Sequence, residues 1–81
     1  MQVLYFAWLK ERIGVGSEEI ETGAATARDL VAELAARGEG HALAFADLSA
    51  VRVAVDQEMG DLDTPIAGAR EVAFFPPVTG G

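Results

Sequence analysis

The two ends of this 81-residue chain are its most continuously apolar stretches, and they limit the possible folds more than any other feature. Val3 to Ala7 is apolar at every position, and so is Val72 to Phe75. Both contain branched and aromatic residues, which favour strands. A strand that is apolar on both sides is typical of a sheet interior. We therefore expect the first and last strands to be neighbours at the centre of one sheet.

The first half of the remaining chain predicts a short strand and one clear helix. Trp8 to Ile13 favours a helical turn, and Glu18 to Glu21 a short strand whose acidic outer face suits a sheet edge. The helix begins at Thr26, with Asp29 three residues later in the pattern of a capping box. Five apolar residues then recur at helical spacing: Ala27, Leu30, Val31, Leu34 and Ala35. Gly38 is the expected C′ glycine, which would end the helix just before it.

The second half predicts two further strands of unequal strength. His41 to Leu48 is open between a short helix and an irregular packed segment. Val51 to Val55 alternates as a strand with one apolar face. Asp56 to Gly60 indicates a turn, with a weak strand before Pro65. Because Met59 in a turn is hard to bury and methionine suits adaptable surfaces, we weigh a partner contact equally with a core role there.

These segments predict an α+β fold of the β-grasp (ubiquitin-like) class. In that arrangement a hairpin leads into one main helix that crosses one face of a mixed sheet, and the terminal strands pair in parallel. Residues 1–75 would form the domain, and 76–81 a flexible C-terminal arm. One helix covers only one face, so the other has to accommodate side chains from Tyr5, Phe74 or Phe75. Exposed apolar patches usually mark binding surfaces.

The last six residues carry no charged side chain, so the terminal carboxylate of Gly81 is the one ionised group there. Pro76 and Pro77 favour a stiff, extended arm that leaves the fold and reaches about 20 Å. Gly80 and Gly81 have no side chain to obstruct a narrow slot. An arm of this kind could deliver its carboxylate into another protein. On these grounds alone, an inert frayed end is slightly favoured.

Composition excludes several classes of function. The net charge of −7 speaks against nucleic acid and anionic membranes as partners and favours a basic protein surface. The chain has no cysteine, which excludes disulfides, thiolate metal sites, a thiol nucleophile and a cysteine persulfide. No apolar run is long enough to span a bilayer, and the N-terminus lacks the features of a signal peptide. We expect a cytoplasmic protein.

A search for catalytic side chains leaves little. His41 is the only histidine and favours a surface or packing role over a metal site. Ser17 and Ser49 lack a partner at motif spacing, and Gly14 to Gly16 lacks the lysine of a phosphate loop. The acidic residues fit a solvated surface better than a calcium site: Glu18, Glu19, Glu21, Glu58, Asp61 and Asp63. The reactive group that remains is the Gly81 carboxylate, which needs activation before it can donate an acyl group.

Two stretches now carry a family resemblance. Val3-Leu4-Tyr5-Phe6-Ala7 and the ending from Glu71 through Phe74-Phe75-Pro76-Pro77-Val78-Thr79-Gly80-Gly81 resemble the small-subunit family of molybdopterin synthase, which are β-grasp sulfur carriers. The resemblance extends over essentially the whole chain, including the turn Ala54 to Gln57. Asp56 departs from it, because relatives often carry Asn there. The region from Gly38 to Ser49 supports it little.

The resemblance implies a carrier that is not an enzyme by itself and binds no cofactor. An activating enzyme of the ubiquitin type would use ATP to adenylate Gly81, and a sulfur-donating enzyme would supply the sulfur of a thiocarboxylate. The arm, with Gly80, would enter the basic site of the large synthase subunit, in a heterotetramer, and give sulfur to precursor Z (cyclic pyranopterin monophosphate). The implied partner contacts are Phe75, Met59, Lys10, Pro76, Pro77, Val78 and Thr79.

Three other functions stay open. A thiazole-synthesis sulfur carrier shares the fold and the Gly-Gly ending, although the Phe-Phe-Pro-Pro sequence favours the first interpretation. A ubiquitin-like modifier would be conjugated to lysines. A plain interaction module would carry an inert tail.

Overall fold

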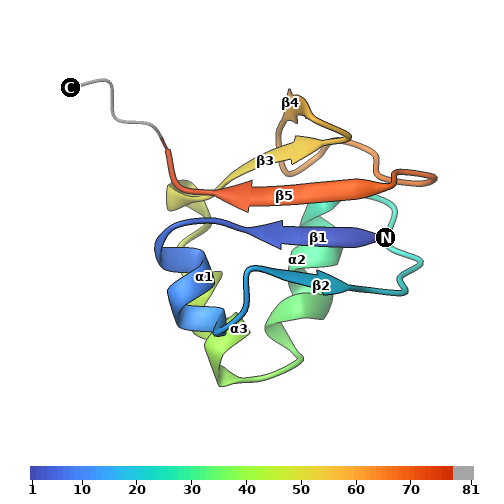
Figure 1. Cartoon of the computed structure of the whole chain (residues 1–81). Coiled ribbons are helices and arrows are strands. Elements are labelled where there is room, and N and C mark those ends of the chain that lie inside the picture. Colours follow the sequence, from blue (N-terminus) through green and yellow to red (C-terminus); the bar gives the residue numbers. More distant parts are fainter. Residues whose placement is uncertain (78–81) are drawn as a thin grey trace.

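The computed structural model describes residues 1–77; Val78 to Gly81, and with them our expectation of disorder in the free arm, lie outside the described residues. The described part forms a five-stranded sheet in the order β2-β1-β5-β3-β4 (Figure 1). The strands are β1 (Gln2–Tyr5), β2 (Ser17–Glu19), β3 (Arg52–Val55), β4 (Glu58–Gly60) and β5 (Glu71–Phe75).

The first and last strands are neighbours at the centre of the sheet, as their apolar sequences predict. β1 and β5 run parallel, with Val3 opposite Val72 and Tyr5 opposite Phe74. β2 pairs antiparallel with β1, and β3 antiparallel with β5. The predicted α+β, β-grasp arrangement is confirmed.

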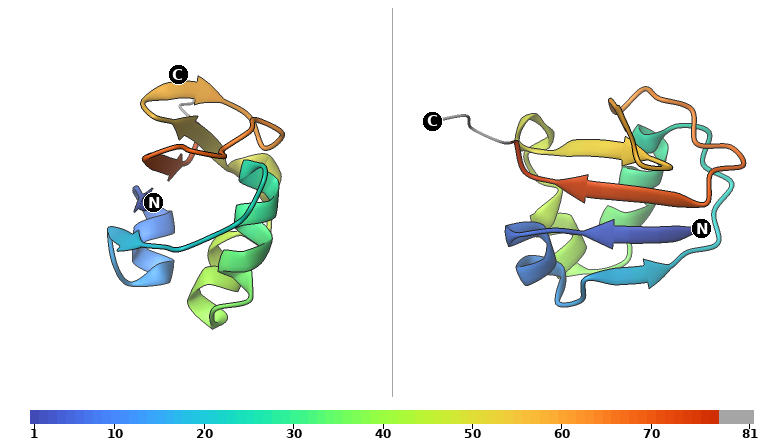
Figure 2. Two further views of the ribbon diagram at one scale, coloured as in Figure 1. Left: turned by 90° about the vertical axis from the view of Figure 1, so that its right-hand side faces the viewer. Right: turned by 45° about the horizontal axis from the view of Figure 1, so that its top comes forward.

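Three α-helices and one 3-10 turn accompany the sheet within residues 1–77. They are α1 (Trp8–Ile13), α2 (Ala27–Ala35), α3 (Glu39–Ala44) and η1 (Leu48–Ala50). Figure 2 shows α2 and α3 on one side of the sheet, while α1 lies at the end where β1 finishes. The core between these layers consists mainly of Val3, Tyr5, Leu9, Leu30, Leu34, Val53, Ile66, Val72 and Phe74, all nearly inaccessible to solvent. No helix of the described residues is long and apolar enough to cross a membrane.

The predicted start of α2 is confirmed, but its predicted end is wrong. The Thr26 side chain accepts a hydrogen bond from the Asp29 N–H at 3.2 Å, which satisfies one of the free donors of the first turn. The helix ends at Ala35, and Gly38 is the residue before α3 rather than a left-handed C′ glycine. The ambiguous segment after Gly38 therefore contains two short helical elements, α3 and η1.

The predicted turn Asp56 to Gly60 is also wrong in part. The turn consists of Asp56 and Gln57 alone, both at positive φ (49° and 69°). Residues with these dihedrals connect a tight hairpin, so the next three residues pair with β3 as β4. Met59 accordingly lies on an edge strand, opposite Ala54, and not in a turn.

The apolar opening segment is not buried along its whole length. β1 ends at Tyr5, Phe6 is 48% exposed, and Ala7 leaves the strand with φ 53°. Tyr5 and Phe74 both face the helices, with 1% and 0% exposure, so neither contributes to the other face of the sheet. Of the three aromatic residues proposed for that face, only Phe75 lies there.

Candidate docking surface and arm root

The face of the sheet turned away from the helices is apolar and lacks a covering layer in the described structure. Side chains alternate along each strand, so the residues between the buried ones point to the open face, and paired residues of neighbouring strands share a face. The residues placed on the open face in this way include Leu4, Ala54, Met59, Ala73 and Phe75. Met59 is 70% exposed, and Phe75 is half-buried. These five residues are the centre of a candidate docking surface.

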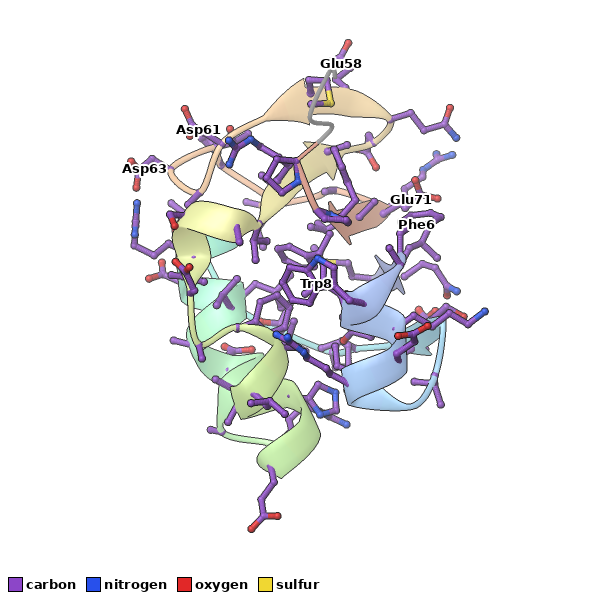
Figure 3. The ribbon with its side chains drawn as sticks, turned by 90° about the vertical axis from the view of Figure 1, so that its left-hand side faces the viewer. Phe6, Trp8, Glu58, Asp61, Asp63 and Glu71 are labelled. Carbon is purple, nitrogen blue, oxygen red and sulfur yellow. The ribbon has the colours of Figure 1, made fainter. Side chains whose placement is uncertain are left out.

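Phe6 adds to this surface, and sequence reasoning missed its role. The Leu9 N–H donates to the Phe6 carbonyl at 3.2 Å, closing a turn in which Ala7 has φ 53° and ψ −132°. These dihedrals suit glycine far better than alanine. Figure 3 shows that the turn separates two aromatic side chains, with Phe6 toward the outside and Trp8 toward the middle of this end. The apolar run suggested a longer strand, so the turn was not recognisable from the sequence pattern.

The arm begins at the same end of the sheet as α1 (Figure 1). The last hydrogen bond of the central pair runs from the Phe6 N–H to the Phe74 carbonyl at 3.1 Å. Pro76 and Pro77 follow Phe75 directly and have no N–H to continue the ladder. Both prolines are half-buried, so the described start of the arm contacts the domain. The arm root is therefore anchored in the most central strand of the sheet.

The charges around the open face differ between its two ends. Arg52, opposite Phe75, and Lys10 of α1 bring positive charge to the arm end. Glu19 and Glu71 lie at the other end, level with Gln2 of β1. Glu58, Asp61 and Asp63 lie on β4 and the loop after it (Figure 3), outside this face, since Glu58 is opposite Val55 and Asp63 pairs with Arg28 of α2. A partner for this face needs a matching pattern of charge.

Lys10 itself is exposed on α1, and the same helix carries a second cationic residue, Arg12. The Arg12 guanidinium lies over the Trp8 ring, 4.5 Å from its centre, in a cation–π arrangement. Trp8 and Arg12 were not among the residues expected to matter. A Trp-x-x-x-Arg spacing at i and i+4 on a helix is a signal that could have indicated the pair.

The structure brings together some of the expected site residues and leaves others untested. Phe75 and Met59 share the open face, Pro76 and Pro77 start the arm at its border, and Lys10 lies on α1 at the same end. The expected roles of Val78, Thr79, Gly80 and Gly81 concern positions outside the described residues. Within residues 1–77, no three histidine, aspartate or glutamate side chains are grouped to hold a metal ion.

Comparison with known sequences identifies full-length relatives. The chain is 40% identical over 81 residues to the molybdopterin synthase sulfur carrier subunit of Haemophilus influenzae, and 38% identical to that of Escherichia coli. In both cases the match covers 100% of this chain and 99% of the relative. A family model described as the ThiS family matches residues 3–81.

Solved structures agree with these relatives. A Pyrococcus furiosus chain described as molybdopterin converting factor, subunit 1, superposes with a TM-score of 0.71 at 31% identity, covering 95% of each chain. SAMP1 of Haloferax volcanii superposes with a TM-score of 0.73 at 27% identity, covering 100% of this chain and 98% of that one. The chain thus belongs to the ThiS family, among the sulfur carrier subunits of molybdopterin synthase.

Proposed function

We propose that the chain carries sulfur on its own C-terminus and delivers it to a pterin. A carboxylate oxygen of Gly81 attacks the α-phosphorus of ATP on an activating enzyme and releases pyrophosphate. Sulfide delivered by a donating enzyme then attacks the acyl adenylate, forms the new carbon–sulfur bond and displaces AMP, which leaves a thiocarboxylate. In the large synthase subunit this sulfur passes to cyclic pyranopterin monophosphate, where it becomes part of the dithiolene of molybdopterin.

The observation that carries this proposal is the sequence of the arm on a full-length relative of known sulfur carriers. Phe-Phe-Pro-Pro-Val-Thr-Gly-Gly begins with the last two residues of the central strand β5, and relatives at 38% and 40% identity bear the sulfur carrier name. A fixed root with a thin tip suits a group that must enter another protein's site, because holding the root limits the positions of the tip. ATP is used by the activating partner in this scheme, and the chain supplies no catalytic side chain.

The open face supplies the docking surface of the proposal. Phe75, Met59 and Phe6 present apolar area beside the arm root, which an apolar surface on the large subunit can cover. Lys10 and the arm residues from Pro76 to Thr79 are the further contacts proposed. A heterotetramer of two small and two large subunits in the cytoplasm completes the proposal.

Intact-mass measurement tests the chemistry directly. The purified chain is incubated with an activating enzyme, ATP and a sulfur source, and we expect a mass increase that corresponds to one oxygen replaced by sulfur. A matched chain with one extra residue after Gly81 should gain nothing, because its Gly81 carboxyl is part of an amide. Molybdopterin formation by that extended chain with purified partners would overturn the mechanism.

A protein modifier is the second candidate, and one comparison favours it. The chain resembles small archaeal modifier protein 1 of H. volcanii, with 27% identity and a TM-score of 0.66 over 96% of this chain. Isopeptide-linked adducts of Gly81 in cell extracts would support this function. The thiazole-synthesis carrier is the third candidate, and complex formation with a thiazole synthase rather than the large synthase subunit would support it.

A further inference from the structure

One carboxylate on the edge strand β2 faces inward and accepts two hydrogen bonds. Glu18 Oε2 lies 2.7 Å from the Tyr5 hydroxyl oxygen and 2.7 Å from Nε2 of His41. The Glu18 and His41 side chains are 21% and 14% exposed. We expected Glu18 to lie on a solvated acidic face, but its position opposite Val3 turns it toward the helices. The three residues join β1, β2 and α3.

The chemistry of the three groups determines the direction of each bond. An ionised carboxylate only accepts, so the Tyr5 O–H and the His41 Nε2–H both donate to Glu18. This holds for the neutral imidazole as well as the imidazolium, because Nε2 carries a proton in both. Tyr5 is buried, and its hydroxyl would lack a partner without Glu18, which is costly in a protein interior.

The two donors also act on the ionisation of Glu18. Burial acts to raise the pKa of its carboxyl, but the hydrogen bonds from His41 and Tyr5, with the charges of His41 and Arg37, hold that pKa below its ordinary value. Burial first, and then the bond to Glu18, raises the pKa of Tyr5, which stays a donor. The groups facing Glu18 are therefore Tyr5 from β1, His41 from α3 and Arg37 from the connection between α2 and α3.

Contacts lead from this cluster to the arm end of the sheet. The Tyr5 ring packs edge-on against His41 (6.0 Å between centroids) and against Phe45 (6.4 Å). Phe45 packs edge-on against Phe74 at 5.1 Å, one residue before Phe75. Tyr5 and Phe74 are also opposite each other in the parallel pair. The cluster thus lies beneath the strand ends from which the arm departs.

The same cluster ties α3 to the sheet, and α3 also packs against α1. A Cβ placed on Gly40 would lie only 2.5 Å from the Arg12 carbonyl oxygen, so the two helices approach closely at this glycine. α3 is a short helix of six residues, and a helix of this length depends on tertiary contacts. His41, next to Gly40, supplies its hydrogen bond to the sheet.

We propose that Glu18 and His41 are positioning residues, which with Tyr5 form a clasp that fixes α3, and through it α1, against the arm end of the central strands. The clasp keeps the Lys10 surface of α1 and the Phe75 strand end in one fixed arrangement. It opens when Glu18 is protonated. Because the folded pKa of Glu18 is lowered, its contribution to stability is complete above the unfolded value and is lost as the pH falls through the lower folded value.

The test uses the whole chain and nuclear magnetic resonance. The Glu18 side-chain carboxyl carbon is titrated in the wild type and in Tyr5→Phe, His41→Leu and His41→Gln, with the urea-unfolded wild type as the reference. We expect Glu18 to titrate at lower pH in the folded chain than in the unfolded chain, and to move toward the unfolded value in Tyr5→Phe and His41→Leu. His41→Gln, which keeps an N–H donor, should restore most of the difference.

Amide exchange supplies the second readout. The Phe45 N–H, which bonds to the His41 carbonyl, and the Phe6 N–H, which bonds to Phe74, should exchange about tenfold faster in His41→Leu, the loss expected for one bond to a charged acceptor. Tyr5→Phe changes only one oxygen and serves if His41→Leu fails to fold. A Glu18 carboxyl that titrates at the same pH in the folded and the unfolded wild type, or exchange at Phe45 and Phe6 that is unchanged in both variants, would overturn the clasp. Neither result depends on sulfur transfer.

Discussion

The two faces of the sheet are built from the same strands yet differ in what covers them. Toward the helices, Val3, Tyr5, Val53, Val72 and Phe74 are at most 1% exposed. On the opposite face Leu4, Ala54, Met59, Ala73 and Phe75 are also apolar, but the described structure provides no layer over them. Apolar patches that no layer of the domain covers usually mark interaction surfaces, so these residues indicate a surface that another molecule covers. One face holds the domain together, and the other is available for a partner.

The largest expected difference between the two faces is in how much their side chains contribute to the stability of the domain. Phe74→Ala removes a fully buried ring from the aromatic cluster, and we expect the free energy of unfolding to fall by about 4 kcal/mol. Phe75→Ala is the matched control, the same substitution at the next position on the other face. It should cost about 1 kcal/mol, because the side chain is only half-buried. Denaturant unfolding measures both, and equal losses would remove the contrast between the faces.

A smaller difference is expected in how much the side chains of each face contribute to binding a partner. Phe75→Ala and Met59→Ala should each weaken association with the large synthase subunit by about 1–2 kcal/mol, or about 5- to 30-fold, because both remove apolar contact area. Isothermal titration calorimetry measures the change. Leu43→Ala on α3 is the control, since Leu43 is also exposed but lies in the helix layer. A larger loss for Leu43→Ala than for Phe75→Ala would place docking on the helical side.

The smallest effect concerns the turn that carries Phe6 to the open face. Ala7→Gly should raise the free energy of unfolding by about 1 kcal/mol, because glycine adopts φ 53° and ψ −132° without the clash of a Cβ. The same substitution at Ala32, which is exposed within α2, should lower it by about 1 kcal/mol. Thermal unfolding compares the two. If both variants lose stability, the turn at Ala7 is not strained.

Local sequence identified most elements, and the errors have a common physical origin. Strands with continuous apolar sequences and the Thr26 cap were recognisable because each depends on neighbouring residues. Gly38 was misassigned because glycine suits both a C′ position and the start of the next helix. Met59 was placed in a turn because nothing in Asp56 to Gly60 shows that a two-residue hairpin would return the chain to pair with β3.

The candidate site was likewise only partly predictable from the sequence. The positions of Phe75 and the two prolines at the end of the strand were predictable from the local sequence, because a central strand must end where N–H groups are missing. The exposed position of Phe6 and the inward direction of Glu18 were not predictable, because the face to which each side chain points depends on how the neighbouring strands are paired. A shift of one residue in pairing moves a side chain to the opposite face.

The sequence by itself determined the central pair of strands and the uncovered apolar face, and the chemistry proposed for the C-terminus rests on the sequence alone. These features depend on the composition and on the spacing of apolar residues, both of which can be seen in the linear sequence. Only the tertiary structure decided which aromatic residues face the helices and that Tyr5, Glu18 and His41 meet. Those three are separated by 13 and 23 residues along the chain. Their contact requires strand pairing and helix packing to be in place together, and no local pattern records that.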